Sequence, residues 1–126
     1  MGVEHPQVVD PAHPLVERVR AICLAYPEAV EIPAWGRPTF RAGKKIFVMV
    51  GAGMEHPLSI VFKPAPDEAG PYSHDARFFV PPYWGPRGWL ATRLDRATTD
   101  WVELAEIIDT SYRQVALVRQ IKALDK

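Results

Sequence analysis

Apolar residues recur at helical spacing near both ends of this chain and at strand spacing between them. A first helix is predicted to begin at Pro14, which suits the first helical position, and to end before Pro27. Its apolar stripe consists of Leu15, Val19, Ile22, Cys23 and Tyr26. Residues 1–13 lack this periodicity and contain two prolines, so they predict an irregular N-terminal arm.

Five short segments between residues 30 and 94 have the alternation and composition of strands. They span residues 30–32, 38–42, 45–50, 58–63 and 89–94. Residues 45–50 are apolar on both sides for most of their length, which is typical of a central strand. The glycines at 51 and 53 are not followed by a third glycine that opens a helix, so they indicate a hairpin loop rather than a phosphate loop.

Residues 64–88 are rich in proline and aromatic residues, and we predict a long ordered loop. A C-terminal helix is predicted to begin near Asp100, which is a suitable cap and has Glu103 three residues later. Its apolar stripe continues to Ile121, with Thr110-Ser111 as an expected break. Together the elements predict one α+β domain over residues 1–126. An antiparallel sheet of about four to five strands would carry the N-terminal helix and one or two C-terminal helices on one face.

Composition excludes several classes of protein. A chain of 126 residues fits one domain. Cys23 is the only cysteine, so an intrachain disulfide is excluded, and its place in the apolar stripe predicts a packed thiol. No apolar run approaches the roughly 18 residues that span a bilayer, and the N-terminus lacks the pattern of a signal peptide. We therefore expect a cytoplasmic protein with no membrane partner.

Catalytic and metal-binding patterns are missing from the sequence. The four histidines, at 5, 13, 56 and 74, are scattered without the spacing of a helical metal site, so we expect no metal. The serines lack the glycines of a nucleophile elbow. An acidic row follows residue 100 and consists of Asp100, Glu103, Glu106 and Asp109; it is typical of the solvated side of a helix.

Basic and aromatic residues mix in the middle of the chain. Residues 35–96 hold nine basic and five acidic residues, although the whole chain balances at 15 and 15. The candidate phosphate contacts are Arg37, Arg41, Lys44, Lys45, Lys63, Arg87 and Arg93, and the candidate aromatic pocket is Trp35, Trp84 and Trp89. Cationic groups bind phosphates and planar rings stack on bases. The same residues also suit a structural role, with arginines along sheet edges and tryptophans capping a core.

Several separate motifs resemble the MmcQ/YjbR family of small bacterial proteins. They are Leu24-Ala25-Tyr26-Pro27, Trp35-Gly36-Arg37-Pro38-Thr39-Phe40-Arg41, Gly43-Lys44-Lys45-Ile46-Phe47, Gly88-Trp89-Leu90 and Asp109-Thr110-Ser111-Tyr112. The similarity spans roughly residues 14–120. It implies an α+β fold similar to the frataxin/CyaY type, and members of the family are commonly labelled DNA-binding.

An iron-binding role is a poor fit to the residues. The frataxin resemblance would place an acidic ridge on the first helix and the following strand. Here Glu17, Glu28 and Glu31 are interrupted by Arg18 and Arg20. For nucleic acid, the resemblance implies the basic residues at 37, 41, 44 and 45 as contacts, and it supplies no catalytic residue.

Two functions from different classes remain open. The first is a non-enzymatic domain without cofactors that contacts DNA phosphates through a basic sheet–turn surface. The alternative is a small-molecule or protein-partner module in which the rings of residues 64–88 close over a pocket beside the sheet. The alternative predicts a concave, partly apolar cavity near Trp35 and Trp89. Oligomeric state and ligand identity are not determined by the sequence.

Overall fold

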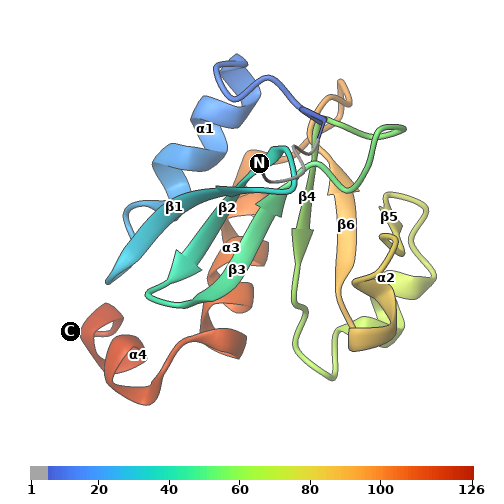
Figure 1. The fold of residues 1–126 in the computed structure, drawn as a ribbon. Coiled ribbons are helices and arrows are strands. Elements are labelled where there is room, and N and C mark those ends of the chain that lie inside the picture. Colours follow the sequence, from blue (N-terminus) through green and yellow to red (C-terminus); the bar gives the residue numbers. More distant parts are fainter. Residues whose placement is uncertain (1–5) are drawn as a thin grey trace.

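A six-stranded antiparallel sheet in the order β1-β2-β3-β4-β6-β5 organises the chain (Figure 1). The computed structural model describes residues 6–126. The strands are β1 (Ala29–Ala34), β2 (Arg37–Ala42), β3 (Lys45–Val50), β4 (Ser59–Phe62), β5 (Phe78–Phe79) and β6 (Leu90–Arg93). The predicted α+β class is confirmed, but there are six strands rather than four or five. The additional strand, β5, is only two residues long and pairs with β6. A strand this short has no alternating pattern from which it could be predicted.

The helices begin and end close to their sequence signals. They are α1 (Pro14–Cys23), α2 (Ala69–Ser73), α3 (Trp101–Val115) and α4 (Val118–Leu124), with a short 3₁₀ helix, η1 (Gly85–Arg87). Asp100 caps α3, because its Oδ1 accepts hydrogen bonds from the backbone N–H groups of Val102 and Glu103 at 3.0 and 3.2 Å. Residues 64–88 contain α2, β5 and η1, so this segment is more regular than the predicted loop.

The chain packs helices against one face of the sheet only, and α3 lies behind the sheet in Figure 1. The core between the sheet and the helices is built around fully buried residues: Val16, Val19, Phe40, Phe47, Ile60, Phe62, Ile108 and Tyr112. Cys23 belongs to this core and is fully buried, as its place in the apolar stripe predicted. The opposite face, called the open face below, has a smaller apolar cluster of Met49, Ala52, Val61, Trp89 and Ala91.

The N-terminal arm crosses the corner between β1 and β2. The backbone N–H of Val8 donates to the carbonyl oxygen of Gly36 at 2.8 Å, and Val9 is buried. Residues 6–13 contain no strand and no helix, which agrees with the predicted irregular arm, and residues 1–5 of that arm lie outside the described part. Within residues 6–126, no helix has the length and apolar character that crossing a bilayer would require.

Ser111 fixes α3 to the centre of the sheet. Its hydroxyl donates to the carbonyl oxygen of Phe47 at the β3 backbone and accepts from the backbone N–H of Lys63, which follows β4, at 2.8 Å. The predicted helix break at Thr110-Ser111 is wrong, because this hydroxyl bonds to the sheet and not to its own helix. The break comes later, between Val115 and Val118, where Ala116 and Leu117 are extended.

Replacing Ser111 with alanine should destabilise the fold. The change leaves a buried carbonyl and a buried N–H without their partner, which costs about 1–3 kcal/mol of unfolding free energy. Urea denaturation of Ser111→Ala and of Ser73→Ala measures the difference. Ser73 is an exposed serine whose hydroxyl bonds only within α2, so its substitution should cost less than about 0.5 kcal/mol. Equal midpoints for the two variants would show that the Ser111 bridge contributes nothing.

Candidate binding site on the open face of the sheet

Strand β2 presents alternate residues to the two faces of the sheet. Phe40 and Ala42 belong to the core beneath the helices. Thr39 pairs across the ladder with Met49, which lies in the open-face cluster. Arg37 and Arg41 share the face of Thr39 by the two-residue period of a strand, and Arg41 Nε donates to Thr39 Oγ1 at 3.3 Å. Both arginines therefore belong to the open face.

The guanidinium of Arg37 is held by two backbone carbonyls. Nε donates to the carbonyl oxygen of Trp35 at 3.1 Å, and Nη1 donates to that of Gly51 at 2.7 Å. Burial lowers the pKa of Arg37 from its ordinary value, yet an arginine stays charged at any physiological pH. A guanidinium has five N–H donors, and the others have no hydrogen-bond partner among residues 6–126. Arg37 thus presents a fixed, charged and partly unused set of donors.

A cavity of about 680 Å³ opens beside Arg37. Its wall is made by the corner after β1, the end of β3 with its loop, and the segment around η1: Trp35, Arg37, Met49, Ala52, Gly53, Met54, Pro82, Tyr83, Trp84 and Arg87. None of these residues is acidic. The cavity has the size of an ordinary ligand site and combines aromatic surface with two arginines.

The three tryptophans of the predicted pocket lie together, in two different roles. Trp35 packs edge-on to Trp84 with ring centroids 6.2 Å apart, and Trp84 packs edge-on to Trp89 at 5.0 Å. Trp35 and Trp84 line the cavity, whereas Trp89 is buried beneath Trp84 and does not. Trp89 therefore supports the site from below.

The other rings of residues 64–88 divide between the two faces. Tyr72 and Phe78 pack against Phe62 in the core under the helices, with centroids at 6.1 and 5.9 Å. Tyr83 lines the cavity and its side chain is 92% exposed. Phe79 packs against the open-face cluster and does not line the cavity. The predicted closure of all these rings over one pocket is thus limited to Tyr83 and Trp84.

Two of the cavity residues have a strained backbone. Trp35 has φ of 53° and Tyr83 has φ of 66°, and within residues 6–126 Glu28 is the one further non-glycine residue with positive φ. Bulky residues rarely adopt this left-handed conformation, which costs of order 1–3 kcal/mol each. Strain of this kind concentrates at binding and catalytic sites.

The candidate cations fall into three groups. Arg37, Arg41 and Arg87 lie on the open face, and the Lys63 ammonium donates to the carbonyl oxygen of Arg87, beside the cavity. Lys44 and Lys45 are exposed at the turn between β2 and β3, and so at the far end of β2 from Arg37. Arg93 forms an ion pair with Asp95, with Nε 3.0 Å from Oδ1. The sequence did not reveal this neutralisation.

Most arginines on the helical side are matched with carboxylates, whereas Arg18 on α1 lies over the ring of Trp101 instead. Their ion pairs are Arg20–Glu31, Arg77–Glu103, Arg113–Asp109, Arg113–Asp125 and Arg119–Glu28. The acidic row on α3 is consequently more than a solvated face, because Glu103 and Asp109 each pair with an arginine. Within the described residues, no carboxylate lies in ion-pair distance of Arg37, Arg41, Lys63 or Arg87. These four cations of the open face are therefore uncompensated.

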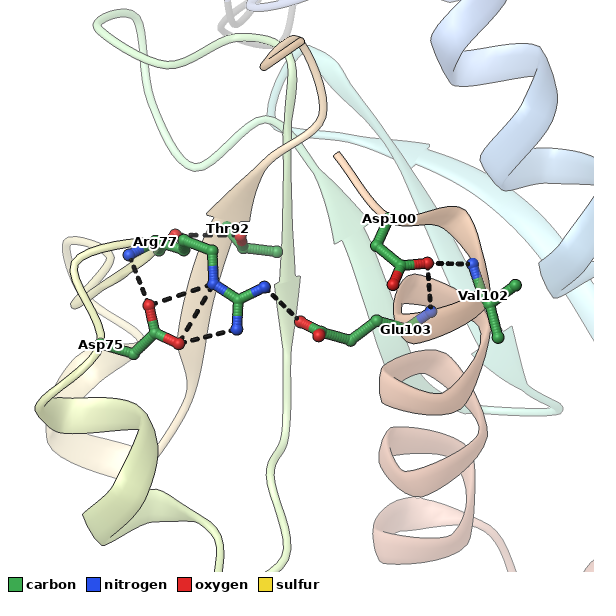
Figure 2. Close-up of polar contacts among 6 residues, drawn as sticks. All are labelled: Asp75, Arg77, Thr92, Asp100, Val102 and Glu103. Atoms are coloured by element: carbon green, nitrogen blue, oxygen red, sulfur yellow. Dashed lines mark hydrogen bonds and ion pairs between the residues drawn. The ribbon is translucent and has the colours of Figure 1, made fainter. Parts of the chain in front are cut away.

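Figure 2 shows how Arg77 is used inside the fold. Its guanidinium pairs with Asp75 Oδ2 at 2.7 Å and with Glu103 Oε1 at 3.0 Å, while its carbonyl oxygen accepts from Thr92 Oγ1 at 2.9 Å. The arginine thereby ties the start of β5 to β6 and to α3. The hydrogen bond from Arg77 lowers the pKa of Asp75 to about 2.

The titration of Asp75 tests this clamp. Its carboxylate stabilises the fold above the ordinary aspartate pKa of 3.8, and that contribution is lost as pH falls through about 2. Carboxyl-carbon NMR should give a pKa near 2 for Asp75 and a return toward 3.8 in Arg77→Gln. The same titration of Asp75 in Arg93→Gln, which breaks a different pair, serves as the control and should show no change. An ordinary value in the unaltered protein would contradict the clamp.

Metal ligands do not converge in the described part of the chain: residues 6–126 contain no group of three or more His, Cys, Asp or Glu side chains suited to a metal ion.

The comparisons with known proteins come from the sequence and from the fold. No curated protein matches this chain. A crystal structure of Deinococcus radiodurans protein DR2400, described with the family-model domain DUF419, is similar with a TM-score of 0.67 and 19% identity. The match covers 87% of each chain, and at this identity it shows the fold alone.

A family model supports the resemblance seen in the motifs. The model is described as YjbR and matches residues 24–114, which is most of the chain. The matched region includes the corner at Trp35, all six strands and the helix that carries Ser111. On this match, the chain belongs to the YjbR family.

Proposed function

We propose that this protein is a non-enzymatic DNA-binding domain that contacts phosphates through the open face of its sheet. The contacts would be Arg37, Arg41, Lys63 and Arg87. Lys44 and Lys45 extend the cationic surface along β2 to its far turn, about 20 Å from Arg37 at roughly 3.3 Å per residue. The observation that carries the proposal is the group of four cations on the open face that have no carboxylate in ion-pair distance among residues 6–126.

Uncompensated cations on one surface favour an anionic partner. Neighbouring positive groups repel each other, and a phosphate backbone relieves that repulsion while releasing its own counterions. The helical side offers less of such a gain, because Arg20, Arg113 and Arg119 already bond to carboxylates. The sign and placement of the free charge therefore support phosphate binding on the open face.

The strength of binding is limited by the overall charge. Lys and Arg together balance Asp and Glu at 15 each, so the whole molecule has no long-range field that steers a polyanion. Attraction comes from the local surface and is screened over about 10 Å at 0.1 M salt. We expect weak, strongly salt-dependent binding that is best measured at low ionic strength.

Arg87→Gln and Arg41→Gln should each weaken binding to a labelled duplex. Loss of one phosphate contact lowers the salt dependence, the slope of log K against log salt, by about one unit in magnitude. Fluorescence anisotropy over a salt series measures the slope. Arg18→Gln is the matched control, because Arg18 lies on α1 over the ring of Trp101 at 4.2 Å, on the helical side. Its slope should equal that of the unaltered protein.

The contradicting results are equally defined. A duplex that does not bind in about 20 mM salt, where screening is weak, would count against DNA binding as a function. Equal slopes for Arg87→Gln, Arg41→Gln and Arg18→Gln would show that phosphates are bound elsewhere on the molecule.

A second candidate function is the binding of a free small molecule in the cavity beside Trp35. It is favoured by the volume of about 680 Å³, which lies in the range of ordinary ligand sites. Such a ligand would be planar and anionic, because the walls of the cavity consist of aromatic rings and arginines. The two functions use the same face of the sheet. They differ in whether the ligand belongs to a DNA chain or is a free molecule.

A further inference from the structure

The cavity beside Trp35 is the place where exposed aromatic rings meet the uncompensated cations. We propose that it receives one unpaired nucleobase, so that the open face binds single-stranded DNA in preference to a duplex. The base stacks on the exposed ring of Trp35 or Tyr83, with the flanking phosphates at Arg87 and Lys63. This inference rests on the proposed DNA-binding function, because DNA would supply the base.

The first support is the state of the rings. Trp35 is 42% exposed and Tyr83 is 92% exposed, although both belong to residue types that are usually packed when no ligand is bound. Trp84 stands edge-on between Trp35 and the buried Trp89, which fixes its orientation. Stacking requires only a π-face, which every base has. The ring of Trp35 is packed against Trp84 before binding, and a ring held in this way loses little freedom when a base stacks on it.

The second support is the backbone that presents the rings. Trp35 and Tyr83 both adopt positive φ, at 53° and 66°, and both line this one cavity. At Trp35 the conformation is stabilised by the bond from Arg37 Nε to its carbonyl oxygen. Gly36 follows with φ of 76°, and a side chain there would collide with the carbonyl of Pro6. Two distant segments thus hold a rare conformation at one location.

The third support is the arginine on the wall. The guanidinium of Arg37 is fixed by the carbonyl oxygens of Trp35 and Gly51, at 3.1 and 2.7 Å. Its remaining donors can meet an acceptor on a base edge, such as the N7 atom that adenine and guanine share. Arg87, which is exposed on the opposite wall, is positioned for the backbone.

The shape of the site favours single-stranded DNA over a duplex. In a duplex the bases are stacked on each other, and only their edges are open to a protein. A base can stack on the face of Trp35 only if it belongs to a single DNA strand or has flipped out of the duplex. A cavity of about 680 Å³ is large enough for one base with its sugar.

The test compares three probes with the full chain at low ionic strength: a labelled 15-nucleotide single strand, its duplex, and free dAMP. Single-strand affinity should exceed duplex affinity by about tenfold, and Trp35→Leu and Tyr83→Ala should each lower it by about tenfold. Their duplex affinity should stay unchanged. Trp101→Leu, which removes a tryptophan from α3 on the helical side, is the matched control and should bind all probes normally.

The variants are checked for folding by circular dichroism. Trp35 packs against Trp84, so its replacement could disturb the corner; Tyr83 is 92% exposed and gives an independent measurement. If single strand and duplex bind equally, and neither Tyr83→Ala nor Trp35→Leu matters, the base pocket is overturned while phosphate binding by the open face stands.

A different result would remove the proposed function instead. If neither strand nor duplex binds, DNA is not the partner, and the dAMP titration decides the pocket by itself. Binding of dAMP that is lost in Trp35→Leu and kept in Trp101→Leu would support a base pocket for a free nucleotide. No binding of dAMP under those conditions would overturn the pocket as well.

Discussion

The structure depends on the attachment of α3 to the middle of the sheet. Ser111 places one hydroxyl between the β3 carbonyl of Phe47 and the N–H of Lys63. In the next residue, the hydroxyl of Tyr112 donates to the carbonyl oxygen of Pro27 at 2.7 Å. These bonds lie inside the apolar core, where a polar group without a partner is costly. They commit one face of the sheet to the α-helices and leave the other face open.

The two faces differ in charge because of that commitment. The carboxylates of α3 reach arginines of neighbouring elements, as in the pair of Glu103 with Arg77, so most arginines on the helical side are neutralised. On the open face, basic side chains bond to backbone carbonyls and hydroxyls and keep their charge. The backbone with positive φ at Trp35 and Tyr83 presents exposed aromatic surface at the same place. On this face, unpaired cations and aromatic rings line the same cavity.

The candidate residues were partly predictable. The sequence places arginine, lysine and tryptophan in residues 35–96, and Arg37, Trp35 and Trp84 do line one cavity. Sequence distance could not tell that Arg93 is paired to Asp95, because both a free and a paired arginine have the same neighbours in the chain. It also gave no sign that Trp89 is buried under Trp84. Partner choice is a property of side-chain directions in the folded state.

Local patterns by themselves determined the helices and the long strands, because apolar periodicity, Pro14 at a helix start and Asp100 as a cap act within a few residues. Tertiary structure decided the rest. The short strand β5 exists only because β6 pairs with it. Ser111 continues a helix because Phe47, 64 residues away, accepts its hydrogen bond. The cavity likewise joins segments near residues 35, 52 and 84, and such long-range contacts form only when the whole chain has folded.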